Sequence, residues 1–326
     1  MKDRLQILKL IAKELKTSSI SSEIFEKCYE RNEWFDKENI LDSLSAIVDG
    51  MFSEVELERF AAAYSDYGSE KNIGKSVAII MAGNIPFVGV ADLVYAIFSG
   101  FSNIYLKFAS KDYFTMEWFV ACVKKCCEGV VNIEQFDEQH IDKVIATGSD
   151  NSSRYFSHRY AEVDSLIRQN RSSVALISGS ESENELQNLW SDIFLRYGQG
   201  CRNITQIFIP ADYNIEKLVA LWRKKVVENR HFLNVYLSHR AVMMMQKREF
   251  LDLGYAILVE NSSLFAPLSQ INYSRYSRVE EFEDFVMQNR ERLQVVLKNP
   301  SEFGKAQFPS LFDFADGVDV IKFLFD

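Results

Sequence analysis

One cysteine stands in a setting that favours nucleophilic chemistry. Cys201 lies in the segment GQGCRNIT, preceded by Gly198 and Gly200 and followed by Arg202 and Asn203. Glycines let a substrate approach the backbone closely, and a nearby guanidinium favours the thiolate, which is the attacking form of the side chain. A structural cysteine in a turn between a helix and a strand fits the same spacing equally well. The residues alone therefore leave both interpretations open.

The other four cysteines are expected to be reduced and structural. The total of five is odd, the spacing is not that of metal ligands, and no segment has the pattern of a secretion signal. Cys122, Cys126 and Cys127 lie in the helical segment FVACVKKCCEGVV, where cysteine serves as a small apolar residue. We expect no metal site in this chain.

Two turns follow predicted strands and could contact a ligand. The turn MAGNIP, residues 81–86, places Asn84 just past the first strand, and ATGS places Gly148 past a later one. Open α/β sheets bind ligands at the carboxyl ends of their strands, where an amide could donate to a developing oxyanion. An ordinary turn residue explains each position at least as well. No complete GxGxxG fingerprint is present.

The elements around these residues alternate between strand and helix. About seventy helical residues come first, and from Lys75 onward the strand SVAIIM, the helix GVADLVYAIFSG and the strand NIYLKF follow. The helix FTMEWFVACVKKCCEGV, the strand DKVIATG and the helix SSRYFSHRYA continue the pattern. Such alternation predicts a doubly wound parallel sheet.

A second alternation surrounds Cys201. The strand SSVALISG, the helix SENELQNLWSDIFLRYG and the strand ITQIFIP come first, and two more helices with the strand YAILVE between them precede FEDFVMQNRERLQVVL. A chain of 326 residues exceeds the size of one core, so we expect two lobes. The apolar tail GVDVIKFLFD is predicted as a strand that could pair across a subunit interface.

The composition excludes several classes of protein. The chain is 47% hydrophobic and 25% charged, which is typical of a compact globular protein, and its net charge of -9 disfavours nucleic acid as a partner. The start MKDRLQILKLIAKELK has helical spacing rather than a signal-peptide pattern, and no apolar run is long enough to span a membrane. A cytoplasmic protein is expected.

Taken in order, several motifs resemble one enzyme family. The segments AGNIPFVGVADLVYAIFSG, LKFASKD, ATGSDNSSRYF, RQNRSSVAL, YGQGCRNITQIFIP and FGKAQFPSLFDFADGVDVIKFL resemble the acyl-CoA reductases of the bacterial bioluminescence type, a branch of the aldehyde dehydrogenase superfamily. The resemblance runs from Lys75 to the C-terminus. It implies an α/β, aldehyde dehydrogenase-like fold, with a doubly wound parallel-sheet cofactor domain and a second α/β catalytic domain. It also implies a homo-oligomer, with a dimer favoured.

The expected domain bounds are 1–172 for the helical region and Rossmann-like cofactor domain, 173–300 for the catalytic domain, and 301–326 for a segment that returns to the cofactor domain. The resemblance makes Cys201 the nucleophile and Asn84 the side-chain member of an oxyanion hole, with the Cys201 backbone N–H as second donor. The residues that it places against NADPH or NADH, between which the sequence does not choose, are Met81, Ala82, Gly83, Lys107, Gly148, Ser149 and Phe265.

One departure from the superfamily pattern favours reduction. Aldehyde dehydrogenases carry a glutamate that activates water ahead of the strand SSVALI, whereas this chain reads SLIRQNR. Loss of that base would leave an acyl-cysteine available for hydride transfer, so we expect an acyl-CoA substrate, with a fatty acyl chain, and an aldehyde product. A second departure puts Ser263 where a ribose-binding acid would be. An acyltransferase or thioesterase without redox chemistry, and a non-catalytic scaffold, remain as alternatives.

Overall fold

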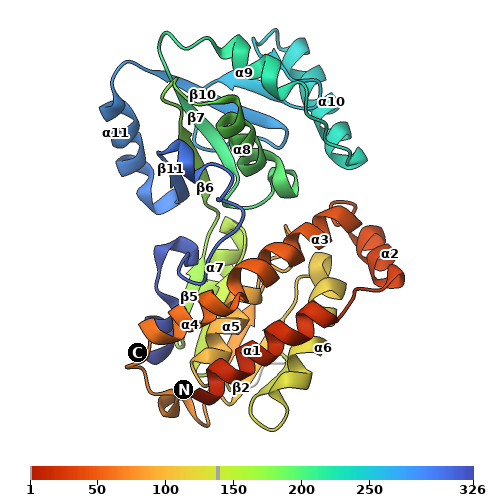
Figure 1. Ribbon diagram of the computed structural model, residues 1–326, viewed down its shortest axis with the longest axis vertical. Coiled ribbons are helices and arrows are strands. Elements are labelled where there is room, and N and C mark those ends of the chain that lie inside the picture. Colours follow the sequence, from red (N-terminus) through yellow and green to blue (C-terminus); the bar gives the residue numbers. More distant parts are fainter. Residues whose placement is uncertain (1, 137–139) are drawn as a thin grey trace. The chain divides into compact units, whose positions relative to one another are not determined.

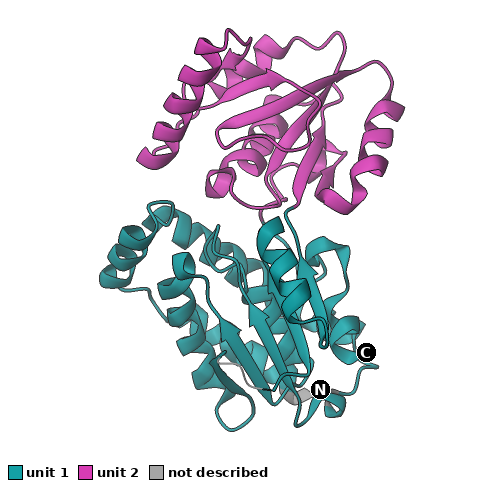
Figure 2. Cartoon of the chain, turned by 180° about the vertical axis from the view of Figure 1, so that it is seen from behind, with its two compact units in different colours: residues 1–170, 308–326 teal, residues 171–307 magenta. Residues whose placement is uncertain are grey.

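The computed structural model describes residues 2–136 and 140–326, which form two compact units (Figure 2). Unit 1 comprises residues 1–170 and 308–326, and unit 2 comprises residues 171–307. The chain therefore passes from unit 1 to unit 2 and back again, and unit 2 is one continuous insertion. Within the described ranges, no helix combines the length and the apolar character that crossing a bilayer requires.

Unit 1 is built on a five-stranded parallel sheet with the order β3-β2-β1-β4-β5. Figure 1 labels β2 and β5 of this sheet. Its strands are β1 (Ser76–Ile80), β2 (Asn103–Lys107), β3 (Asn132–Gln135), β4 (Lys143–Thr147) and β5 (Asp164–Arg168). From β1 the chain runs outward through β2 to β3 and then returns to β4 on the other side of β1. The order in which the chain adds strands therefore reverses between β1 and β4, and doubly wound sheets bind ligands at such a reversal.

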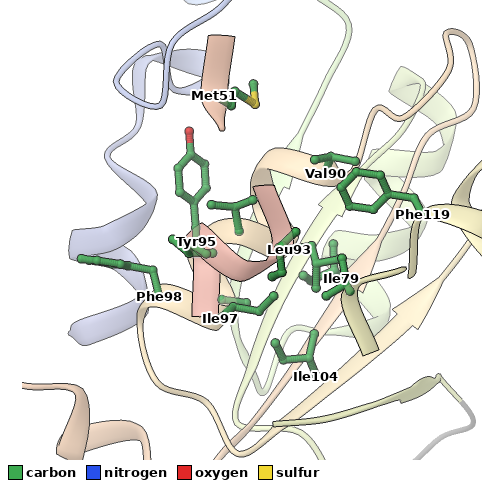
Figure 3. Close-up of a cluster of buried hydrophobic side chains, with 14 of the residues drawn as sticks. Met51, Ile79, Val90, Leu93, Tyr95, Ile97, Phe98, Ile104 and Phe119 are labelled. Carbon is green, nitrogen blue, oxygen red and sulfur yellow. The ribbon is translucent and has the colours of Figure 1, made fainter. Parts of the chain in front are cut away.

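Both faces of this sheet are covered, which explains the continuous apolar run of β1. All five residues of β1 are buried. Val77 and Ile79 belong to the core formed with α5 (Val90–Phe98) and α6 (Tyr113–Cys127). Ala78 belongs to the opposite core, which includes residues of α7 (Asp150–Arg159). Figure 3 shows the first core, where Ile79, Leu93, Ile97 and Ile104 gather between the sheet and α5. The doubly wound fold class predicted from the sequence is confirmed.

Four N-terminal helices pack around the first core. They are α1 (Lys2–Thr17), α2 (Ser22–Arg31), α3 (Lys37–Ala46) and α4 (Glu54–Ala63). Helix α1 contacts α4, α5 and α6, and α2 contacts α6. The helical region of about seventy residues that the sequence predicts is thus formed by these four helices.

The C-terminal tail is a helix, so its prediction as an exposed strand was wrong. Helix α12 (Val320–Phe325) starts at Asp319, whose side chain accepts a hydrogen bond from the amide of Lys322. Val320, Ile321 and Leu324 are completely buried in the core that contains α5. Apolar residues at helical spacing, together with an N-cap, outweigh the strand-like composition of this segment. The structure therefore offers no tail strand for pairing with another subunit.

Unit 2 contains a mixed six-stranded sheet with the order β11-β6-β7-β10-β9-β8. Its strands are β6 (Ser172–Leu176), β7 (Ile204–Pro210), β8 (Leu251–Asp252), β9 (Ile257–Glu260), β10 (Gln270–Tyr276) and β11 (Leu293–Leu297), and only the β8–β9 pair is antiparallel. Its helices are α8 (Glu183–Phe194), α9 (Ile215–Trp222), α10 (Arg230–Met245) and α11 (Val279–Asn289). The sequence predicts one helix on each side of the strand YAILVE. In the structure both helices, α9 and α10, precede this strand, and the strand β10 follows it.

Candidate functional site

Cys201 lies in a turn between α8 and β7, at the amino end of β7. The sequence predicts a helix that continues through Tyr197 to Gly198, but α8 ends at Phe194. Arg196 and Tyr197 adopt left-handed backbone conformations with φ of 54° and 56°. Such conformations are costly for residues other than glycine, so the surrounding contacts must hold this loop in place. We call residues 195–203 the Cys201 loop.

A buried asparagine holds the Cys201 loop against the end of α8. Asn203 is 1% exposed, and its Nδ2 donates to the main-chain oxygens of Ile193 and Leu195, at 3.0 and 2.9 Å. Its Oδ1 accepts from the amide of Gly200 at 2.8 Å. On the other side, the hydroxyl of Ser173 donates to the main-chain oxygen of Cys201 at 2.9 Å. The backbone on both sides of the thiol is therefore fixed.

The exposure of the five cysteines singles out Cys201. All five lie within the described residues, and Cys201 is the exposed one. Cys28, Cys122 and Cys127 are buried, and Cys126 is partly exposed. Burial raises the pKa of Cys28 and of Cys127 to about 12, so these thiols are not thiolates near neutral pH. Among the five cysteines, the exposed one is thus the one that the sequence identifies as the candidate nucleophile.

A small pocket lies beside the Cys201 loop within unit 2. Its volume is about 30 Å³, which is enough for about two water molecules. Its lining includes Phe194, Tyr197, Phe232, Pro267 and Ile271. The lining also contains the polar residues Asn203, Thr205, Ser269 and Gln270, and Cys201 is not part of it.

In unit 1, Asn84 is exposed in the turn that follows β1, as predicted. Gly83 must be glycine because an added Cβ would lie 2.5 Å from the Cβ of Ala109. Asp112, which is 1% exposed, anchors the far side of this turn: its Oδ2 accepts from the amide of Phe87 at 2.9 Å, and Thr115 donates to its Oδ1. Burial raises the pKa of Asp112 to about 8, and these hydrogen bonds oppose the rise.

The other residues of unit 1 that are predicted to bind the cofactor lie, like Asn84, at the carboxyl ends of the strands. Met81 and Ala82 follow β1, and the amide of Met81 bonds to the main-chain oxygen of Lys107, at the end of β2. Lys107 is exposed. Gly148 follows β4, and Ser149 caps the start of α7 by accepting from the amide of Ser152 at 3.3 Å. These residues lie around the carboxyl ends of β1 and β4, between which the strand order reverses.

An ion pair is buried next to this edge. Arg168, the last residue of β5, donates from Nη1 and Nη2 to the two oxygens of Asp92 at 2.7 and 2.8 Å. Both side chains are 6% exposed. Burial alone would lower the pKa of Arg168, but attraction to Asp92 outweighs that effect and the pKa is raised. Arg168 belongs to SLIRQNR, the segment in which the superfamily pattern would have a glutamate, and it pairs with β4 opposite Thr147.

Phe265 and Cys201 lie in unit 2, whereas Asn84 and the other predicted cofactor residues lie in unit 1. Phe265 is in the loop between β9 and β10. The guanidinium of Arg292 lies 4.6 Å from the centre of its ring, and the ring packs against the core that contains Phe282. In unit 2, Cys201 precedes β7 and Phe265 precedes β10, whereas in unit 1 the predicted residues lie at the carboxyl ends of the strands.

Sequence reasoning assigned no role to several residues that shape these loops. Asn203, Asp112 and Asp92 were each present in a quoted motif, and Asp192 lies in the predicted helix SENELQNLWSDIFLRYG. Asp92 and Asp192 share a detectable signal, because each places a carboxylate in an otherwise apolar stretch of helix. A charge at such a position is either paired or hydrogen-bonded in the folded chain.

Comparison with known proteins identifies the fold. No known family model matches the sequence, and no curated protein sequence does so either. Solved structures do match. Aldehyde dehydrogenase 21 from Physcomitrella patens, solved with succinate, has a TM-score of 0.66 at 14% identity, covering 92% of this chain and 78% of its own. The fold is that of the aldehyde dehydrogenases.

Two other structures with the aldehyde dehydrogenase fold carry nicotinamide cofactors. The glyceraldehyde-3-phosphate dehydrogenase of Methanocaldococcus jannaschii, complexed with NADP, has a TM-score of 0.63 at 15% identity and covers 91% of this chain and 80% of its own. The aldehyde dehydrogenase of Bacillus cereus, complexed with NAD+, has a TM-score of 0.60 at 16% identity and covers 90% of this chain and 76% of its own. At such low identity the likeness extends to the fold only.

Proposed function

We propose that this chain is a reductase that converts an acyl-CoA thioester to an aldehyde with NADPH or NADH, through an acyl group bound to Cys201. The observation that carries the proposal is the exposed thiol of Cys201 in a loop whose backbone is fixed on both sides. The aldehyde dehydrogenase fold and the motifs quoted above support it, and the resemblance to acyl-CoA reductases supplies the substrate class.

In the proposed reaction, the Cys201 thiolate attacks the carbonyl carbon of the thioester. The carbon–sulfur bond to coenzyme A breaks, coenzyme A leaves as a thiolate, and the acyl group remains on Cys201. The side-chain amide of Asn84 and the backbone N–H of Cys201 would donate to the oxyanion that forms during attack. A reduced nicotinamide held at the carboxyl ends of the unit 1 strands would supply a hydride to the acyl carbon. The thiohemiacetal anion on Cys201 would then collapse, which releases the aldehyde and restores the Cys201 thiolate.

The residues at the carboxyl edge of the unit 1 sheet fit a nicotinamide cofactor. The edge has an exposed lysine, Lys107, and the amino end of α7 follows Gly148 and Ser149. The amino end of a helix favours an anion such as a pyrophosphate. The ligand-binding crevice of a doubly wound sheet lies where the strand order reverses, here between β1 and β4. These residues of unit 1 would hold the cofactor, and Phe265 is the residue of unit 2 that the resemblance assigns to it.

The buried Arg168–Asp92 pair supports reduction over oxidation of an aldehyde to an acid. Oxidation requires water to be activated against the acyl-enzyme, and a carboxylate ahead of β6 does this in the superfamily. Here Arg168 is a buried cation, and Asp92 is already occupied by two hydrogen bonds to it. Neither residue is suited to accept a proton from water.

Radioactive acyl-CoA provides the test. The purified chain is incubated with acyl-labelled CoA esters of increasing length, and the protein-bound label is measured before and after a chase with NADPH or NADH. We expect label on the wild type, none on Cys201→Ala, and release as aldehyde with a matching loss of reduced-nicotinamide absorbance. Label that leaves as free acid without the cofactor would indicate a thioesterase. Label on Cys201→Ala at normal stoichiometry would refute the nucleophile assignment.

A further inference from the structure

We infer that Asp192 is a positioning residue for Cys201, which acts by fastening residues 304–307 against the Cys201 loop. We call residues 304–307 the crossing segment, because they are the last residues of unit 2 before the chain returns to unit 1. The inference rests on the proposed function only in taking Cys201 as the nucleophile.

Asp192 joins α8, the crossing segment and the Cys201 loop. Its side chain is completely buried near the end of α8. Its Oδ2 accepts from the amide of Gly304 at 2.6 Å, and its Oδ1 accepts from the amide of Ala306 at 2.9 Å. Its main-chain oxygen accepts from the side-chain amides of Asn203 and Gln307, both at 3.2 Å. One residue of α8 thus joins the Cys201 loop, which directly follows this helix, to the crossing segment, which lies more than a hundred residues further along the chain.

The crossing segment also contacts the Cys201 loop directly. Arg202, which follows the nucleophile, donates from Nε to the main-chain oxygen of Ala306 at 2.7 Å. Arg196 donates from Nη1 to Oε1 of Gln307 at 3.2 Å. Ala306 is therefore held on one side by the carboxylate of Asp192 and on the other by the neighbour of Cys201. Release of this segment would take away the acceptor of Arg202 Nε and so loosen the turn that presents the thiol.

The charge of Asp192 is better explained by positioning than by packing. Burying a carboxylate is costly, so this carboxylate needs a compensating interaction, and the two backbone amides of the crossing segment provide it. Burial raises the pKa of Asp192 to about 6, although the two backbone amides and the nearby charge of Arg202 oppose the rise. Above that pH both oxygens can accept hydrogen bonds, as the two amides require.

Hydrogen exchange measured by mass spectrometry tests the inference on the full chain, at a pH above the pKa of Asp192. In Asp192→Ala, the amides of Gly304 and Ala306 lose their acceptor. Exchange in peptides covering the crossing segment and the Cys201 loop should rise roughly ten- to hundredfold, on the scale of hydrogen bonds to charged groups. Asp192→Asn keeps one acceptor oxygen and should give a smaller rise. Asp284→Asn, on the exposed face of α11, is the matched control and should change neither segment.

The pattern of exchange separates positioning from a general loss of stability. Faster exchange confined to the two segments supports the inference, whereas an equal rise in β6 and β7, or no rise at all, overturns it. With acyl-CoA at saturation, the acylation rate should fall in Asp192→Ala and recover in part in Asp192→Asn, with the same substrate affinity. Unchanged acylation in Asp192→Ala would refute positioning. If the wild type forms no acyl-enzyme, the proposed function fails, while the exchange result still decides how Asp192 acts on the loop.

Discussion

The buried Arg168–Asp92 pair allows a quantitative prediction for unit 1. In Arg168→Met the carboxylate of Asp92 stays buried and loses both of its hydrogen bonds, of 2.7 and 2.8 Å. Removing one partner of a buried ion pair costs about 3–5 kcal/mol, because the remaining charge is uncompensated. At a factor of ten for each 1.4 kcal/mol, this equals roughly two to three and a half orders of magnitude in the equilibrium for opening.

Replacing both partners should cost much less than replacing one. The double variant Asp92→Val with Arg168→Met removes both charges and fills a similar volume with apolar atoms. We therefore expect its opening free energy to be at most about 1 kcal/mol below that of the wild type. The single variant Asp92→Val, which leaves the guanidinium of Arg168 unpaired, should be destabilised like Arg168→Met. The three variants and the wild type form a double-mutant cycle that isolates the pair.

Hydrogen exchange of peptides from β4 and β5 is the appropriate assay, because it reports on unit 1 separately. Peptides from β7 in unit 2 serve as the internal control and should exchange at the wild-type rate in all variants. The reasoning would be refuted if Arg168→Met changed the opening free energy by less than about 1 kcal/mol. It would equally fail if the double variant were destabilised by the sum of the two single effects, since the pair would then contribute nothing as a pair.

Three further predictions concern the turn that carries Asn84. Asn84→Ala should slow formation of the acyl-enzyme by roughly a hundredfold or more, measured by rapid quench with labelled acyl-CoA, and a near-normal rate would remove it from the oxyanion role. Burial raises the pKa of Asp112 to about 8, above its value in the unfolded chain. The stability that protonated Asp112 contributes is therefore complete below its ordinary pKa of 3.8 and is lost as the pH rises from there through about 8. Urea unfolding should show the stability of Asp112→Asn rising relative to the wild type over that range, and a constant difference would contradict this. Gly83→Ala should destabilise unit 1 by about 1–3 kcal/mol in the same assay, because the new Cβ meets Ala109. Gly68→Ala, with nothing within 4 Å of its added Cβ, should be neutral, and equal effects of the two changes would argue against the steric explanation.

The buried parallel strands were the most predictable part of the fold. The runs SVAII of β1 and SSVAL of β6 are buried along their whole length, so their apolar composition is continuous and easily read. The edge strands β3 and β5 were not predicted. Most residues of NIEQ and DSLIR are exposed or only partly buried, and strands at a sheet edge lack a strong apolar pattern.

Long-range contacts explain what the sequence could not show about the site. The exposure of Cys201 and its place in a turn agree with its glycine-flanked motif, and Asn84 lies past β1 as expected. The two amides that donate to the Asp192 carboxylate are more than a hundred residues away along the chain, and no local pattern links them to it. Helix α12 was missed for a similar reason, because its apolar residues find their partners in the core around α5 rather than in their own neighbourhood.

The insertion of unit 2 between two parts of unit 1 sets the order in which the molecule can be completed during synthesis. All of unit 2 leaves the ribosome before α12 does, so unit 2 can finish folding while the apolar surface of α5 is still uncovered. Domains made by a ribosome generally fold as units, beginning from the N-terminus. Here the unit that begins first is the one that closes last, and for that interval its core is exposed to chaperones and to aggregation.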